Sequence, residues 1–263
     1  MGLDGQADTA GTLKAAALVT GGARRIGRAI TEALAAAGHP VAIHCNASRG
    51  DAETLASAIA AGGGRAAVVV GDLARPETAA GIVAAAEAAL GPVGLLVNNA
   101  SMFEDDTPLT LSPESFSAHM TVNLLAPCLL AGEMARRLPE GATGLVVNIV
   151  DQRVLKPTPQ FFSYSLSKAG LWWATRTLAQ ALAPKVRVVA LGPGPTLKSE
   201  RQAEEDFRRQ SDAVLLGRGP DPAEFGRTIA WLLATPSVTG QIIALDGGQH
   251  LAWQTADVVG IPE

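Results

Sequence analysis

Tyr164 and Lys168 stand four residues apart, one turn along a segment of helical period. A phenol has a reference pKa of about 10, so it exchanges protons near neutrality only where a fixed cation stabilises its anion. An ammonium group at i+4 on the same helical face is such a cation. Tyr164 is also the only tyrosine in the chain. The pair predicts an enzyme that moves a proton; the alternative is a half-buried aromatic ring beside a solvated lysine.

A glycine-rich turn follows the first apolar segment, and residues 20–27 read Thr-Gly-Gly-Ala-Arg-Arg-Ile-Gly. Glycine lets the backbone turn tightly, and the N–H groups of the following helix then face an anionic pyrophosphate. The alternative is a tight connection without a ligand, but the position directly after the first expected strand favours the dinucleotide interpretation. The residues expected to contact the cofactor here are Gly21, Arg24, Arg25 and Ile26.

The end of the second expected strand bears on the choice between NAD and NADP. A carboxylate at this position usually binds the ribose 2′-hydroxyl of NAD, whereas cationic and hydroxyl groups accommodate a 2′-phosphate. No carboxylate follows the strand before Asp51, so the sequence favours NADP(H). The side chains expected around the 2′ position are Arg24, Arg25, His44 and Ser48, with Asn46 beside them.

The elements that must position these residues alternate between strand and helix. Short apolar runs are separated by alanine-rich stretches of helical period, which predicts a single doubly wound α/β domain of the Rossmann type. We expect about seven parallel strands with helices on both faces, because continuous apolar strands indicate a sheet covered on both sides. The expected strands are 15–20, 41–45, 66–70, 94–98, 144–150, 186–191 and 241–245. The expected helices are 25–37, 51–61, 76–90, 113–138, 163–182 and 222–234. Residues 192–219 show no clear period and form a candidate substrate lid.

Composition limits the partners, the compartment and the metal sites that we expect for this chain. The chain has 263 residues, a formal net charge of −4 and no dense Lys/Arg run, which argues against nucleic acid or an anionic membrane surface as partner and favours a small molecule. Cys45 and Cys128 are too few for a disulfide framework and fall in apolar segments, as expected of reduced thiols in a cytoplasmic protein. The four histidines lack ligand spacing, so no metal site is expected. Residues 1–13 read as a flexible head without a signal sequence, ahead of one domain over 14–263.

Taken together, the motifs resemble the short-chain dehydrogenase/reductase superfamily over roughly residues 15–250. The glycine-rich turn matches, as do the adenine-side pair Asp72-Leu73, the run Asn98-Asn99-Ala100 after the fourth strand and the nicotinamide-side pair Pro193-Gly194. The resemblance implies that Tyr164 is the catalytic acid/base, and that Lys168 lowers the pKa of Tyr164 and binds the nicotinamide ribose. It also implies that Asn123 is a fourth catalytic residue, which holds a water that relays protons to Lys168.

Two departures narrow the resemblance. Asp151 occupies the place of the usual catalytic serine, thirteen residues before Tyr164, and Arg25 replaces the middle glycine of the turn. Both, together with Ser101 and Phe103, are similar to the pteridine reductases and the bacterial dihydromonapterin and dihydrofolate reductases. That resemblance implies that Asp151 acts with the tyrosine and lysine, that Ser101 contacts cofactor and substrate, and that Phe103 stacks on the pterin. The alternatives are that Asp151 only caps a loop and that Phe103 is a core aromatic.

The expected function is NADPH-dependent reduction of a pterin-type C=N bond. The nearest alternative is a carbonyl reductase of a 3-oxoacyl thioester or a sugar ketone, and the alternative from another class is an NADP(H)-sensing protein without turnover. Retention of Tyr164 and Lys168 argues against the sensor. Trp172 and Trp173 are neighbours on one expected helix and cannot both face the core, so one is expected at a subunit interface of a homodimer or homotetramer.

Overall fold

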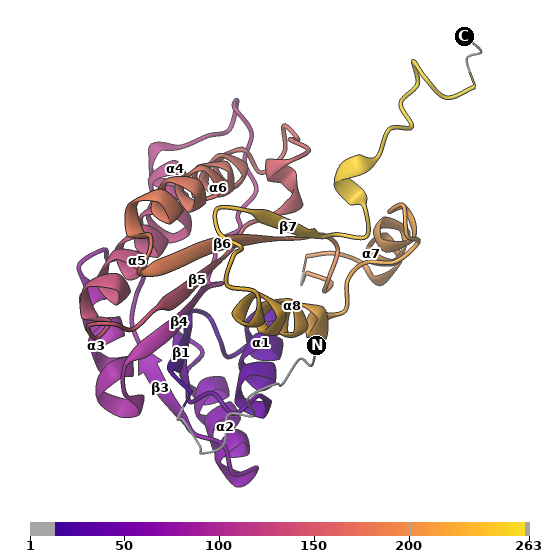
Figure 1. Ribbon diagram of the computed structural model, residues 1–263. Coiled ribbons are helices and arrows are strands. Elements are labelled where there is room, and N and C mark those ends of the chain that lie inside the picture. Colours follow the sequence, from indigo (N-terminus) through magenta and orange to yellow (C-terminus); the bar gives the residue numbers. More distant parts are fainter. Residues whose placement is uncertain (1–13, 200, 261–263) are drawn as a thin grey trace, which may run out of the picture.

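Seven parallel strands form one sheet in the order β3-β2-β1-β4-β5-β6-β7 in the computed structural model, which describes residues 14–199 and 201–260 (Figure 1). The predicted doubly wound α/β fold is thereby confirmed. The predicted head at residues 1–13 lies outside the described residues. The strands are β1 (Ala16–Val19), β2 (Val41–Cys45), β3 (Ala66–Val70), β4 (Val93–Asn98), β5 (Gly144–Ile149), β6 (Val186–Pro193) and β7 (Ile242–Leu245).

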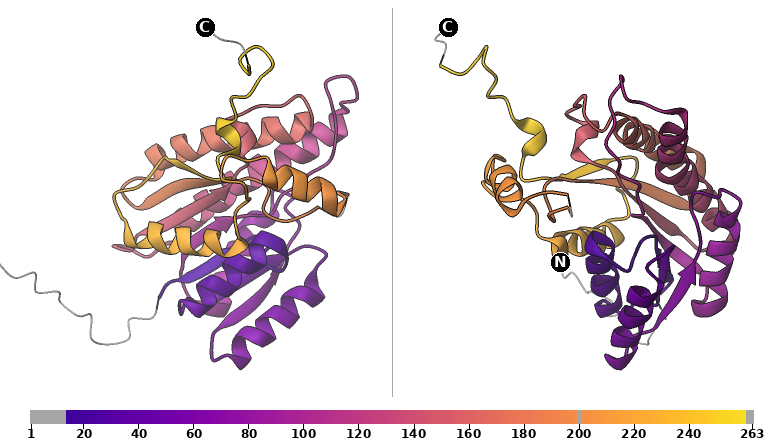
Figure 2. Two further views of the ribbon diagram at one scale, coloured as in Figure 1. Left: turned by 90° about the vertical axis from the view of Figure 1, so that its right-hand side faces the viewer. Right: turned by 180° about the vertical axis from the view of Figure 1, so that it is seen from behind.

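Helices cover both faces of the sheet, which explains why its central strands are apolar throughout (Figure 2). On β1, Ala17 and Val19 pack into the cluster under one set of helices, while Leu18 between them packs into the cluster on the other face. The first set is α1 (Arg25–Ala36), α2 (Arg49–Ala61) and α8 (Pro222–Ala234). The second set is α3 (Thr78–Leu90), α5 (Ala126–Arg137) and α6 (Phe162–Leu182).

The strand order reverses at β1, which pairs with β2 on one side and with β4 on the other. The connections that follow β1 and β4 therefore run to opposite faces of the sheet, and a crevice opens between the loops at the carboxyl ends of these strands. The glycine-rich turn follows β1, and the segment that begins at Asn99 follows β4. The fold thus brings the predicted cofactor motifs to one edge of the sheet.

The predicted helix over 113–138 is interrupted. Helix α4 (Pro113–Met120) passes through a π-helical turn, Thr121–Leu125, before α5 begins. Pro127 at the start of α5 has no N–H for the carbonyl of Asn123, so a continuous α-helical ladder cannot form there. The wider turn encloses Asn123, one of the predicted catalytic residues.

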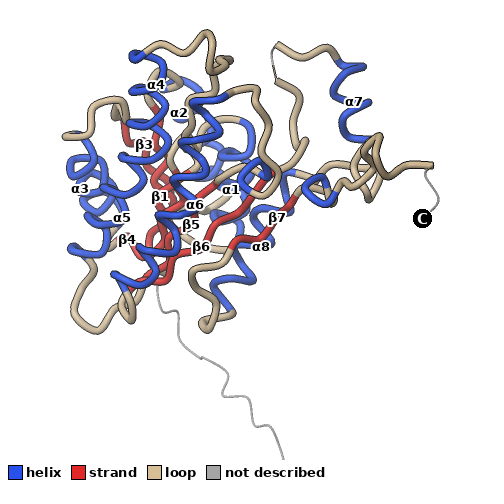
Figure 3. Tube along the Cα trace, turned by 90° about the horizontal axis from the view of Figure 1, so that it is seen from above, coloured by secondary structure: helices blue, strands red, loops and turns tan. Residues whose placement is uncertain are grey.

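The predicted lid at residues 192–219 contains a helix that the sequence pattern did not indicate. Helix α7 (Glu204–Asp212) lies at the periphery of the molecule (Figure 3). It has no buried residue, and it lacks the apolar stripe from which a helix is recognised. Acidic residues in its first turn, Glu204 to Asp206, favour its start. Within the described part of the chain, no helix has the length and hydropathy needed to cross a membrane.

Candidate active site

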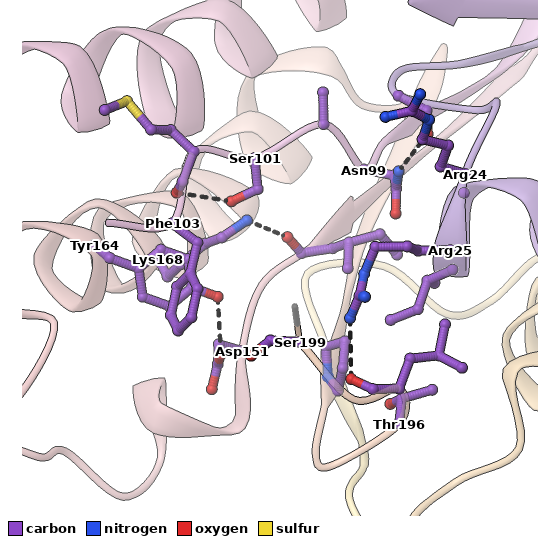
Figure 4. A pocket seen from close by; sticks show the side chains of 18 of the residues that line it. Arg24, Arg25, Asn99, Ser101, Phe103, Asp151, Tyr164, Lys168, Thr196 and Ser199 are labelled. Atoms are coloured by element: carbon purple, nitrogen blue, oxygen red, sulfur yellow. Dashed lines mark hydrogen bonds between the residues drawn. The ribbon is translucent and has the colours of Figure 1, made fainter. Parts of the chain in front are cut away.

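A cleft of about 980 Å³ lies at the carboxyl edge of the sheet, and its lining includes the end of β2 and the first turns of α6. Figure 4 shows the part of the cleft around Tyr164, Lys168 and Arg25. Helix α7 and the segment before it also line the cleft. All predicted site residues except Asn123 line it: Gly21, Arg24, Arg25, Ile26, His44, Asn46, Ser48, Asp72, Leu73, Asn99, Ala100, Ser101, Phe103, Asp151, Tyr164, Lys168, Pro193 and Gly194.

The predicted catalytic side chains meet where β5 ends and α6 begins. Tyr164 donates its phenolic hydrogen to Asp151 Oδ2 over 2.8 Å (Figure 4). One turn further along α6, Lys168 Nζ donates to the carbonyl of Ile149 over 2.8 Å and lies 5.7 Å from the centroid of the Tyr164 ring. Tyr164 and Lys168 are both buried. The i+4 spacing thus places the ammonium group beside the phenol, as the sequence predicted.

Burial and the neighbouring carboxylate set the protonation of these groups. Burial raises the pKa of Tyr164 well above its usual value, and the negative charge of Asp151 and its hydrogen bond to the phenol raise the pKa further. Burial lowers the pKa of Lys168 to about 8, while the charge of Asp151 opposes this shift. The raised pKa of Tyr164 is contrary to the expectation that Lys168 lowers it. Tyr164 therefore holds its proton at neutral pH, which suits a residue that donates the proton in a reduction.

Asp151 caps a loop and also contacts the Tyr164 hydroxyl. Its Oδ1 accepts the backbone N–H of Arg153 at 2.8 Å and so caps a short 3₁₀ turn, Gln152–Val154. Its Oδ2 accepts Tyr164, and Arg153 Nη1 lies 3.2 Å from the same oxygen. Three donors converge on one carboxylate, which fixes its orientation toward the phenol.

An aromatic cluster borders this group. Phe103 stacks on Phe161 with ring centroids 4.3 Å apart, and it meets the Tyr164 ring edge to face at 4.6 Å. The guanidinium of Arg153 lies 5.7 Å from the centroid of Phe103 and 5.3 Å from that of Phe161. Phe103 is therefore part of the cleft wall rather than of a core cluster.

Asn123 lies behind the cleft and forms hydrogen bonds with two of the segments that line the cleft. Its Oδ1 accepts the backbone N–H of Met102 at 2.8 Å and the hydroxyl of Ser101 at 3.2 Å. Its Nδ2 donates to the carbonyl of Met102 at 2.9 Å and to Ser167 Oγ on α6 at 3.0 Å. The amide group thus holds the segment after β4 against the catalytic helix, while its expected role in holding a water stays a prediction.

Asp106, which the sequence did not single out, fixes the start of α6. Its Oδ1 accepts the backbone N–H of Ser163 at 2.9 Å, its Oδ2 accepts the Ser163 hydroxyl, and its backbone carbonyl accepts the N–H of Phe162 at 3.1 Å. These bonds satisfy donors that a helix N-terminus leaves free. Burial favours the neutral acid, but the hydrogen bonds from Ser163 outweigh it and lower the pKa of Asp106.

At the cofactor end of the cleft, backbone segments lie so close together that two positions require glycine. Gly21 adopts a positive φ of 60°, and a Cβ at Gly27 would lie 2.2 Å from the Gly21 carbonyl oxygen. Asn99 Nδ2 donates to the carbonyls of Thr20 and Gly21 at 2.9 and 3.2 Å, which ties the turn to the end of β4. A side chain at either glycine would disturb this cradle, so the turn suits a ligand that must approach the backbone.

Two predicted contacts to the 2′ position are corrected by the structure. Arg25 donates to the carbonyls of Leu197 and Lys198 at 2.9 and 2.8 Å, so its guanidinium group is engaged by the segment after β6 (Figure 4). His44 is buried between backbone groups: Nδ1 accepts from Gly21 N at 3.3 Å and Nε2 donates to Gly71 O at 3.1 Å. Burial lowers the pKa of His44 to about 4, so the ring is neutral and shapes the turn instead of supplying charge.

Arg24 on the turn before α1, together with Asn46 and Ser48 after β2, therefore remains available for a 2′-phosphate. Arg24 is exposed and pairs with Asp51, with 2.5 Å between Nη2 and Oδ2. Asn46 Nδ2 lies 3.4 Å from Asp72 Oδ1, beside the predicted adenine-side pair. Neither Asp51 nor another acid at the end of β2 lines the cleft in the described part of the chain. These side chains fit a cofactor with an anionic group on its ribose.

Comparisons with known proteins agree with this geometry. The family model for the short chain dehydrogenases matches residues 15–209. The chain belongs to this family. A short-chain type dehydrogenase/reductase from Picea abies is 32% identical over 89% of this chain and 91% of its own. The crystal structure of FolM alternative dihydrofolate reductase 1 from Brucella canis, complexed with NADP, is 54% identical, with a TM-score of 0.91 over 94% of this chain and 98% of its own. A 3-oxoacyl-[acyl-carrier-protein] reductase from Synechocystis is 30% identical over 88% of this chain and 95% of its own.

For a short-chain dehydrogenase, the substrate side of this cleft carries residues that sequence reasoning missed. Phe161 stacks on Phe103 from a left-handed backbone position (φ 53°) directly before α6, and no sequence pattern indicated this contact. Arg153 and Asp106 gave no signal, because the aromatic partners of Arg153 and the Ser163 partner of Asp106 come from separate segments. The described residues contain no cluster of three His, Cys, Asp or Glu side chains that could hold a metal ion.

Proposed function

We propose that this chain reduces a pterin-type C=N bond with NADPH. It is an NADP-dependent oxidoreductase of the short-chain family. The observation that carries the pterin assignment is the 2.8 Å hydrogen bond between Tyr164 and Asp151 beside the Phe103 ring. A serine at position 151 would offer one hydroxyl, whereas the Asp151 carboxylate, which already accepts from Tyr164 and Arg153, keeps acceptor capacity for an N–H group of the substrate. Phe103 adds a flat apolar surface, so the wall suits a planar heterocycle with a polar edge.

Each residue of the site has its own role in the proposed reaction. NADPH bound along the cleft supplies a hydride to the substrate carbon. Tyr164 gives its phenolic proton to the adjacent ring nitrogen, and the Lys168 ammonium stabilises the phenolate that remains. Asp151 holds the substrate's N–H edge in place, and Ser101 contacts both cofactor and substrate. Asn123 and Asp106 hold the segment after β4 against helix α6 through hydrogen bonds.

A carbonyl reductase is the second candidate, because the Synechocystis 3-oxoacyl reductase shares the scaffold. Asp151 argues against it, since a ketone oxygen needs a donor and an ionised carboxylate supplies none. An NADP(H) sensor without turnover is less favoured, because the chain retains both Tyr164 and Lys168, and both line the cleft.

Steady-state kinetics with purified protein separate the three functions. We expect NADPH-dependent turnover of dihydrobiopterin and dihydrofolate to exceed turnover of a 3-oxoacyl thioester. Turnover of the thioester alone would replace the pterin assignment with the carbonyl reductase. Tight NADPH binding without turnover of any substrate would support the sensor.

Assembly and location also belong to this proposal. Trp172 packs against a buried cluster, whereas the neighbouring Trp173 on α6 is 65% exposed, as the prediction that the two face differently requires. Leu125 and Leu166 are exposed as well. We propose that this side of the molecule joins a homodimer or homotetramer, with the free thiols Cys45 and Cys128 fitting a cytoplasmic location. Light scattering during size-exclusion chromatography measures the assembly.

A further inference from the structure

The outer half of the substrate side of the cleft contains a cation that the catalytic residues do not use. Two guanidinium groups line this half, from Arg153 and Arg201. Arg153 is occupied inside the cleft, where it pairs with Asp151 and lies against the aromatic rings. Arg201 belongs to the segment before α7 and is 59% exposed. It therefore lies where the substrate's far end would leave the cleft.

Two partners hold Arg201 in place, one of which, Glu104, does not line the cleft. Its Nη2 donates to Glu104 Oε2 over 2.6 Å, and its Nη1 donates to the carbonyl of Phe103 over 3.4 Å. Among the described residues, Arg201 lines the cleft and Glu104 does not. The acid thus orients the guanidinium from behind, and the remaining N–H groups of Arg201 stay available for a ligand.

Among the described residues that line this half of the cleft, the two acids are already paired. Asp151 is bound by Arg153, and Asp206 on α7 is bound by Arg209 with 2.8 Å between Nη2 and Oδ1. Gln210, which also lines the cleft, accepts from Gln202 at 3.0 Å and keeps its own amide N–H groups free to donate. The outer cleft therefore presents donors and a cation to whatever extends past Phe103.

We propose that Arg201 selects substrates with an anionic group on the substituent of the heterocycle, a carboxylate or a phosphate ester. This inference rests on the proposed function and adds the chemistry of the substrate's tail. Arginine binds both anions through paired N–H donors. Because the site is half exposed, the selection it provides is moderate, about five- to tenfold in kcat/KM.

The test compares substrates that share one ring. Dihydroneopterin and its 3′-phosphate differ only in the anion, and dihydrofolate carries carboxylates on a longer tail. In Arg201→Gln, we expect kcat/KM for both anionic substrates to fall about five- to tenfold relative to dihydroneopterin, mainly through KM. Arg201→Lys should recover part of the loss, since it keeps the charge but not the paired donors. A loss confined to dihydrofolate identifies the carboxylate, and one confined to the phosphate ester identifies the phosphate.

A matched control removes the same charge from the same part of the chain. Arg208 on α7 is exposed and does not line the cleft, so Arg208→Gln should leave the ratio between anionic and neutral substrates as in the wild type. An equal fall for all three substrates in Arg201→Gln, or the same ratio in both variants, overturns the inference while pterin reduction stands. If the wild-type enzyme reduces none of the three, the proposed function fails as well.

Discussion

Tyr164 and Asp151 share a hydrogen bond of 2.8 Å, and this contact joins the family's acid to the residue that departs from the family's pattern. The carboxylate keeps the phenol protonated, because its charge and its hydrogen bond both raise the pKa of Tyr164. A neighbouring Ser would leave the phenol easier to ionise. The pair thus favours donation of a proton over its removal from a substrate alcohol.

Tyr164→Phe should lose most turnover while keeping the fold and cofactor affinity. The substitution removes only the phenolic hydroxyl from a buried ring, and general acid catalysis contributes about a hundred- to ten-thousandfold. The measurements are kcat with dihydrobiopterin and the Kd for NADPH by fluorescence. If kcat stays above about a tenth of the wild-type value, another group delivers the proton.

Asp151→Ser should sharply impair reduction of dihydropterins and leave any weak ketone activity unchanged or higher. The loss of a carboxylate leaves a buried N–H edge of the substrate unpaired, at a cost of about 1 to 3 kcal/mol. Kinetics on dihydrobiopterin and a 3-oxoacyl thioester give the comparison, with Phe103→Ala as a second variant that should raise KM for pterins more than for small ketones. A parallel decline of both activities in Asp151→Ser would argue that the residue serves only to cap its loop.

The pH profile should report Lys168. Burial lowers the pKa of its ammonium group to about 8 in the free enzyme, so the charge is present below that pH and is lost as the pH rises through it. We expect kcat/KM to fall above about pH 8, since this parameter follows groups of the free enzyme. In Lys168→Arg the alkaline decline should be absent below about pH 10, although activity is lower throughout. A decline that stays near pH 8 in this variant would assign it to a different group.

Cofactor preference should depend on Arg24. NADPH should be preferred over NADH by roughly a hundredfold, through charge-assisted hydrogen bonds at the end of β2. Because Arg24 is exposed, Arg24→Ala should reduce this preference by about tenfold rather than abolish it. Arg28→Ala is the control, since Arg28 is exposed on α1 and pairs with Glu32 away from the cleft. Equal kcat/KM values for the two cofactors in the wild type would contradict the assignment.

Asp106→Ala should destabilise the protein by about 2 kcal/mol, because it leaves the N–H and hydroxyl of Ser163 without their acceptor at the buried start of α6. Chemical denaturation measures the free energy of unfolding. Asp105→Ala removes the same group from the exposed neighbour and should change this free energy by less than about 0.5 kcal/mol. Similar losses in both variants would show that Asp106 does not hold the helix.

The sequence by itself determined the fold class, the order of the strands' segments and the place of the acid and its lysine. These follow from local rules: apolar runs between helical periods, glycine after the first strand, and the i+4 spacing of Tyr164 and Lys168. It did not reveal α7, whose polar surface carries no helical stripe, or the π-helical turn at Asn123, where the loss of one backbone donor at Pro127 decides the geometry.

Only the tertiary structure decided the partners of the charged and buried groups. Arg25 looked like a ligand for the 2′-phosphate, yet its donors meet carbonyls 172 and 173 residues further along the chain. His44 looked like a polar group at a strand end, yet two backbone segments enclose it and keep it neutral. Asp106 reaches Ser163 in the same way, 57 residues away. Spacing along a chain fixes neighbours within one helix or strand, whereas hydrogen bonds and desolvation depend on which distant segments pack together, and these set the charge and direction of each side chain in the site.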